Sequence, residues 1–319
     1  MSFLDVLQFI IPAAILYASP LIITAIGGVF TERAGVVNIG LEGIMIMGAF
    51  ISIVINLTFA DQLGSWAPWV GLAVAMFVGI VFSLILAVAA VSLRADQTVT
   101  GVALNMLGLA VAVFATKLLY DKGQTDSINE RFSRFDVPGL SEIPVIGKMF
   151  FTDVYGTSIL AIGVAILAWF VLFKTPFGLR LRSVGEHPMA ADTMGIKVAR
   201  TRYYAVMISG ALGGIGGAIY AQAIAGNFSA GTISGQGFMA IAAMIFGKWH
   251  PLGALGAALF FGLAQSLSIV GATIPYVKEV PEFVLLALPY VLTILALAGF
   301  VGKASAPKAS GKPYIKGKR

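Results

Sequence analysis

The stretch 69–92, WVGLAVAMFVGIVFSLILAVAAVS, is apolar almost throughout and contains no charged residue. As a helix rising about 1.5 Å per residue it would be about 36 Å long, enough to cross the roughly 30 Å hydrocarbon core of a bilayer. Its apolar residues form a continuous run rather than the alternating pattern of a strand in a membrane barrel. The stretch therefore predicts a membrane-spanning helix.

Comparable apolar runs occur on both sides of this stretch. They lie at 4–26, 39–60, 97–120, 155–174, 203–225, 252–271 and 283–301, and a shorter run lies at 235–247. The chain of 319 residues is 58% hydrophobic and 11% charged, whereas a soluble domain is about 25% charged. The sequence predicts an all-α, polytopic membrane protein with about 8–10 transmembrane helices. The run at 235–247 would be a short or broken helix, because it covers only about 20 Å.

The charged residues indicate which loops lie on which side of the membrane. Residues 174–202 contain six Lys/Arg and two acids, whereas residues 121–153 contain four Lys/Arg and six acids. The positive-inside rule then makes 175–202 a cytoplasmic loop and 121–153 an external loop. We expect a single transmembrane domain over 1–302, with an external N-terminus after nine crossings.

The net charge of +6 is concentrated in the C-terminal tail. Residues 303–319 contain six Lys/Arg and no acid, and the rest of the chain contains fifteen residues of each sign. This composition predicts a basic, disordered, cytoplasmic tail. With the rest of the chain balanced in charge, this composition argues against binding to nucleic acid.

Polar residues interrupt the apolar sequence at 31–43, TERAGVVNIGLEG. Asn38 is predicted to cap a helix that starts at Ile39, and Glu42 would lie near the positive end of that helix. Ionisable groups at membrane depth are costly and often mark a transport pathway. A structural role and a role along a pathway are both open for Asn38 and Glu42. Glu32 and Arg33 are predicted to lie at the membrane interface.

Two further polar residues belong with this group. Asn105 would lie about 12 Å into its span and needs a partner, either a neighbouring helix or a passing substrate. Gln236 opens the short run after two glycines, and broken helices of this kind often border transport pathways. The small residues of 209–217, SGALGGIGG, predict close helix packing rather than a nucleotide-binding loop.

The loop 182–202, RSVGEHPMAADTMGIKVARTR, predicts a short cytoplasmic helix. Pro188 suits the first helical position, and Gly195 suits the residue after the helix end. The helix would expose Met189 and Met194, either to a docked partner or to the bilayer surface. His187 and His250 have no second ligand nearby in the sequence, so we expect no metal site. The sequence also contains no P-loop motif of the form GxxxxGK[ST], so the chain is not expected to hydrolyse ATP.

Four stretches, taken together, resemble a known family. They are ERAGVVNIGLEGIMIMGAF, DQTVTGVALN, SVGEHPMAADTMGI and GQGFMAIAAMIFGKWHPLGALGAALFFG. They resemble the permease subunits of ATP-binding-cassette importers of the branched-chain amino acid and simple-sugar group. Within this group they are most similar to nucleoside importers served by a basic-membrane-protein-like lipoprotein.

The resemblance implies a role and a set of partners. It implies a multi-pass permease in a bacterial inner or plasma membrane, with a cytoplasmic C-terminus, that moves nucleosides inward. The partners would be a second related permease, a cytoplasmic ATPase that uses the ATP, and an extracytoplasmic substrate-binding lipoprotein. This chain would be a transport subunit rather than an enzyme, and would bind no cofactor itself. Ribose-like sugars and branched-chain amino acids are the rival substrates, and an ion-coupled secondary transporter is the rival class.

The resemblance and the polar positions described above together give two sets of expected site residues. The segment that matches the coupling region, Ser183 to Ile196, would dock on the ATPase. Its expected coupling residues are Gly185, Glu186, His187, Pro188, Met189, Ala190, Ala191, Met194 and Gly195. The apolar face would enter a cleft of the ATPase, with Ala190 and Ala191 small enough for close approach. The expected substrate-pathway residues are Asn38, Glu42, Asn105 and Gln236.

Overall fold

The structure is a computed structural model that describes residues 3–144, 146–270 and 306–316, together with the single positions 284, 287, 291 and 294. Its long helices are α1 (Phe3–Arg33), α2 (Leu41–Leu63), α3 (Ala67–Ala87), α4 (Gln97–Tyr120), α6 (Gly156–Lys174), α9 (Val198–Ile219) and α11 (Pro251–Val270). The shorter helices are α5 (Ile146–Phe150), α7 (Pro176–Glu186), α8 (Pro188–Thr193) and α10 (Gln236–Phe246). Strands β1 (Arg134–Phe135) and β2 (Val154–Tyr155) form a two-residue antiparallel pair.

The long helices confirm an all-α, polytopic membrane protein. Within the described residues, 6 helical stretches are long and apolar enough to cross a membrane. One of them, Leu41–Ser92, contains both α2 and α3, which a 3-10 turn at Gly64–Trp66 joins. The predicted span at 283–301 lies outside the described residues, apart from single positions.

The centre of the bundle is α1, α9 and the helices that pack on them. The small residues of α9 allow close contact, as their sequence predicts. A methyl group on Gly214 would overlap the backbone carbonyl of Ala75 in α3, and one on Gly217 would overlap that of Met45 in α2. Glycine is therefore required at both positions by the space available to the backbone.

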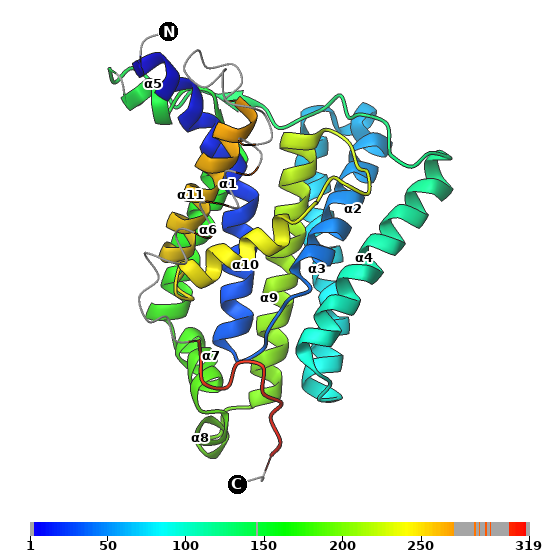
Figure 1. Ribbon diagram of the computed structural model, residues 1–319, viewed down its shortest axis with the longest axis vertical. Helices are drawn as coiled ribbons and strands as arrows, with labels where there is room; N and C mark the ends of the chain where they lie inside the picture. The colour runs from blue at the N-terminus through cyan, green and yellow to red at the C-terminus, as the bar shows by residue number, and fades with distance from the viewer. Residues whose placement is uncertain are drawn as a thin grey trace.

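Helix α10 does not run along the bundle axis. Figure 1 shows it lying obliquely across α1 and α9, near the middle of the molecule. It is 11 residues long, which is too short to span the hydrocarbon core. The prediction of a short or broken helix near 235–247 is confirmed.

The loops that the charge distribution assigns to opposite sides of the membrane lie at opposite ends of the bundle. The start of α1 and α5 of the 121–153 loop are at one end, and α7, α8 and the C-terminal segment are at the other (Figure 1). The expectation of a disordered tail is wrong for residues 306–316, which fold against the body. The Ala309 N–H donates to the Gly185 carbonyl at 2.9 Å, and Ala309 is buried.

Candidate substrate-pathway and coupling sites

Glu42 joins the first turn of α2 to the first turn of α10. Its carboxylate accepts hydrogen bonds from the backbone N–H of Gly235 at 2.7 Å and of Gly237 at 2.6 Å. Helix α10 begins between these two donors, at Gln236, so the carboxylate lies at the positive end of the α10 dipole. The sequence placed Glu42 at the start of its own helix, which is correct, but its hydrogen-bond partners belong to a second helix.

Asn38 does not cap the helix that follows it, so that prediction is wrong. Helix α2 begins at Leu41 with Gly40 in the N-cap position, and no side chain caps it. The Asn38 side chain instead donates from Nδ2 to Ser209 Oγ of α9 at 3.0 Å. Its physical role is to link the loop between α1 and α2 to α9.

Asn105 bonds to a neighbouring helix, which was one of the two predicted alternatives. Its Oδ1 accepts from the Gly43 N–H at 2.8 Å, and its Nδ2 donates to the Ile39 carbonyl at 3.0 Å. Asn105 therefore supplies hydrogen bonds for the loose chain around the start of α2, where helical bonds are missing.

The four expected pathway residues thus meet around the first turn of α2. Asn38, Glu42 and Gln236 are buried, and Asn105 is partly buried. Within the part of the chain that the structure describes, Asn38 Oδ1 and Gln236 Oε1 are buried acceptors without a hydrogen-bond partner. Buried acceptors without a partner are uncommon in proteins. The region therefore contains more hydrogen-bond acceptors than the surrounding protein groups satisfy.

Glu32 and Arg33 are predicted to lie at the membrane interface, but both side chains bond to Trp249 inside the protein. Glu32 is buried and accepts a hydrogen bond from the indole N–H of Trp249. Arg33 Nε donates to the Trp249 carbonyl at 2.8 Å. Lys248 and Trp249 both have positive φ, at 55° and 52°, in the turn between α10 and α11. Helix α10 is therefore held at its start by Glu42 and just beyond its end by the last turn of α1.

His250 follows this turn, outside the spanning segments, and stacks on Phe173 with ring centroids 4.7 Å apart. Burial, and then the nearby Arg33 guanidinium, lower the pKa of His250. The lowered pKa favours the neutral form of His250. We therefore assign His250 a packing role against Phe173.

The structure confirms the short helix in the 182–202 loop. Helix α8 has Pro188 at its first position, and Gly195 follows its end with φ of +81°. Met189 is 41% exposed and Met194 is 82% exposed, and His187 and Ala190 are also exposed. These side chains form an outward face at the end of the molecule.

Two of the expected coupling residues, Ala191 and Gly185, face the protein itself rather than outward. Ala191 is 4% exposed and packs with Val184 and Val198. Gly185 is buried, and a methyl group there would overlap the Arg33 carbonyl. Both positions seat α7 and α8 on the bundle. The helical periodicity of so short a segment could not show which alanine faces inward.

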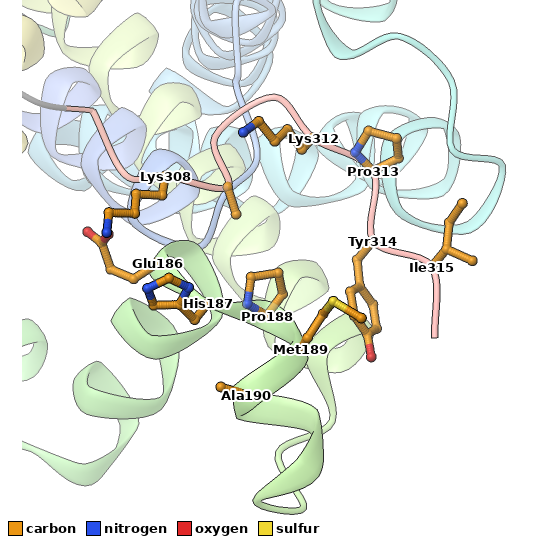
Figure 2. A pocket seen from close by; sticks show the side chains of 11 residues that line it. Glu186, His187, Pro188, Met189, Ala190, Lys308, Lys312, Pro313, Tyr314 and Ile315 are labelled. Carbon is orange, nitrogen blue, oxygen red and sulfur yellow. The ribbon is translucent and has the colours of Figure 1, made fainter. Parts of the chain in front are cut away.

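The C-terminal segment 306–316 lies beside α8, and an open pocket of about 700 Å³ lies between the two (Figure 2). Its walls include Met189 and Ala190 from α8, and Lys312 and Tyr314 from the segment. Burial, together with the nearby Asp192 carboxylate, raises the pKa of Tyr314. Sequence analysis missed this contribution, because the tail has the composition of a disordered end.

A helical membrane bundle with a short, oblique helix across its middle is an arrangement that many membrane transporters share. Polar residues of α2, α4 and α10 gather inside this bundle. A family model described as "Branched-chain amino acid transport system / permease component" matches residues 10–297. The chain belongs to this family.

Individual relatives narrow the comparison. The chain is 63% identical over 319 residues to the guanosine ABC transporter permease protein NupQ of Bacillus subtilis (strain 168), covering 100% of both chains. It is 56% identical over 318 residues to the nucleoside ABC transporter permease protein NupC of Lactococcus lactis subsp. cremoris (strain MG1363), again covering 100% of both. A putative glucose ABC transporter permease protein, TsgC13 of Haloferax volcanii, is 31% identical over 261 residues, covering 81% of this chain and 76% of the relative. The predicted resemblance to ABC importer permeases is confirmed.

The family and the fold together establish the general class of this protein. The chain is a multi-pass membrane protein and a transport component rather than an enzyme. Permeases of ABC transporters work with an ATPase and a substrate-binding protein.

Proposed function

We propose that this chain forms part of the translocation path of an importer that carries nucleosides inward, powered by ATP hydrolysis on a separate chain. The observation that carries the proposal is the full-length identity of 63% and 56% to permeases named for guanosine and nucleosides. This chain itself would bind neither nucleotide cofactor nor metal.

The polar residues around the first turn of α2 support a translocation route for the substrate along α2, α4 and α10. Asn38, Glu42, Asn105 and Gln236 come from these helices and from the loop before α2. Nucleosides carry several hydrogen-bond donors and acceptors, and a path for them needs polar groups inside an otherwise apolar bundle. The buried acceptors Asn38 Oδ1 and Gln236 Oε1 are suited to sugar hydroxyl and base N–H groups.

The two ends of the bundle support the partner assignments. The exposed face of α8 would dock on a cytoplasmic ATPase, which puts the C-terminus in the cytoplasm of a bacterial cell. The 121–153 loop at the opposite end would meet the substrate-binding lipoprotein. Most residues of α4 are exposed, and a second, related permease would complete the path beside this chain.

The test is competitive uptake by the complete complex. The permease pair, the ATPase and the binding protein are reconstituted in liposomes with internal ATP, and entry of labelled guanosine is measured. We expect excess unlabelled nucleosides to abolish uptake, and excess leucine or ribose to leave it unchanged. No ATP-dependent entry of labelled guanosine, beside ATP-dependent entry of labelled leucine or ribose in the same liposomes, would contradict the proposed substrate class while preserving the importer.

A further inference from the structure

The C-terminal segment 306–316 is fixed in place by a buried arginine. Arg202 of α9 is 1% exposed and donates from Nη1 to the Lys312 carbonyl at 3.0 Å. The same guanidinium donates from Nε to the Ala34 carbonyl at 3.2 Å. A buried guanidinium needs such acceptors, because leaving it unpaired is costly. The segment therefore satisfies a polar group of the bundle.

Two further contacts complete the attachment. The Ala309 N–H donates to the Gly185 carbonyl at 2.9 Å, which ties the segment to the end of α7. Tyr314 packs against the apolar cluster of Val184, Ala191 and Val198, which ties it to the inner side of α8. Gly311 has φ of +75°, a conformation that glycine adopts readily in a turn. The segment and α8 thus pack on the same part of the protein, the end of α7 and its apolar cluster.

The pocket between them combines apolar and cationic walls. Met189 and Ala190 line it from α8, and Lys308 and Lys312 line it from the segment. Figure 2 shows the Lys308 side chain directed toward Glu186, whereas Lys312 lies farther along the segment. The pocket lining contains two lysines, Lys308 and Lys312, and one carboxylate, Glu186, so its net charge is positive. A complementary surface would offer an apolar side chain toward Met189 and a carboxylate toward Lys312.

We infer that the C-terminal segment 306–316 is the second wall of the ATPase-docking site, and that its Lys312 engages an acidic residue of the ATPase. This inference rests on the proposed function, because it takes the partner at α8 to be the ATPase. In this arrangement the ATPase contacts two segments that are distant in sequence, α8 and 306–316. Since both are bonded to α7 and α9, motion of the partner would reach the bundle through both.

The test uses charge reversal at two lysines of the same segment. Lys312→Glu reverses the charge in the pocket, whereas Lys316→Glu makes the same change at an exposed position that does not line it. The Lys312 bond to Arg202 uses the backbone carbonyl, so the substitution leaves that bond in place. Met189→Asp serves as a third variant, on the α8 wall.

Binding of the purified ATPase is measured for the permease pair in nanodiscs of phosphatidylcholine alone, which excludes anionic headgroups as the source of charge. We expect Lys312→Glu to raise the Kd at least about fivefold at low salt, with a smaller difference at high salt. Lys316→Glu should stay within about twofold of wild type. Unchanged binding of Lys312→Glu, or an equal loss for both lysine variants, would overturn the inference.

Met189→Asp separates this inference from the proposed function. If Met189→Asp weakens binding and Lys312→Glu does not, the ATPase docks on α8 alone and only the second wall is refuted. If neither variant affects binding, the α8 docking site itself is refuted, and the inference with it.

Discussion

The Glu42 carboxylate replaces two missing backbone acceptors at the start of α10. The first N–H groups of any helix lack intrahelical partners, and Gly235 and Gly237 are bonded to Glu42 instead. Its negative charge is stabilised by aligned peptide dipoles. The residue therefore fixes the half-helix relative to α2 at the proposed route.

Glu42→Gln tests whether this charge matters for transport. Glutamine keeps the size but is neutral and offers only one acceptor oxygen, so one bond to a charged group, worth about 1.5–3 kcal/mol, is lost and the other is no longer charge-assisted. We expect nucleoside uptake to fall at least about tenfold, while the amount of assembled permease in the membrane stays near wild type. The exposed Asp61→Asn, which also removes one carboxylate charge from α2 but lies outside the proposed route and docking surfaces, is the matched control and should transport normally. Wild-type uptake by correctly assembled Glu42→Gln would give Glu42 a packing role alone.

Single residues also show what sequence could and could not predict. Asn38, Glu42, Asn105 and Gln236 stood out because polar groups in apolar runs are costly. Their partners did not, because most are backbone groups, such as the Ile39 carbonyl and the Gly235 N–H. Any residue can supply a backbone donor or acceptor, so no sequence pattern marks it.

At the scale of elements, helix α8 has an outward and an inward side. Ala190 is exposed, whereas the adjacent Ala191 packs against the body of the protein. Pro188 and Gly195 set the helix ends in the sequence, but only packing decides its rotation about its axis.

Tryptophan at these two neighbouring alanines should give opposite effects. Ala191→Trp overpacks the cluster beneath α8, which typically costs about 1–3 kcal/mol, so its melting temperature in detergent should fall. Ala190→Trp should melt like wild type, yet lose substrate-stimulated ATP hydrolysis in the reconstituted complex. A stable Ala191→Trp beside an unfolded Ala190→Trp would mean that the helix is rotated from the described position. Full stimulation in a stable Ala190→Trp would mean that this face contacts no ATPase.

The contact of α9 with α3 depends on the absence of side chains. Gly214→Ala would drive a methyl group into the Ala75 carbonyl, so the helices must separate. We expect a lower melting temperature and less assembled protein. Gly163→Ala is the control, since a methyl group there meets nothing within 4 Å. Equal stability of the two variants would contradict the close packing of α9.

At the scale of the whole molecule, the helical membrane architecture followed from the apolar runs. Their length and continuity depend on bilayer thickness, which is a strong physical constraint. The oblique course of α10 and the docked segment 306–316 depend on long-range contacts, chiefly those of Glu42 and Arg202. Such contacts join residues far apart in the sequence, and local composition does not encode them.

The central claim is that this chain provides a path but no energy source, so the alternation between states must be driven by a partner that binds those states differently. The most direct test is nucleoside accumulation in liposomes that contain this chain alone, under imposed proton and sodium gradients, beside liposomes with the complete complex and ATP. We predict accumulation only in the complete complex, and only with hydrolysable ATP. Gradient-driven accumulation by the single chain would contradict the claim and identify a secondary transporter.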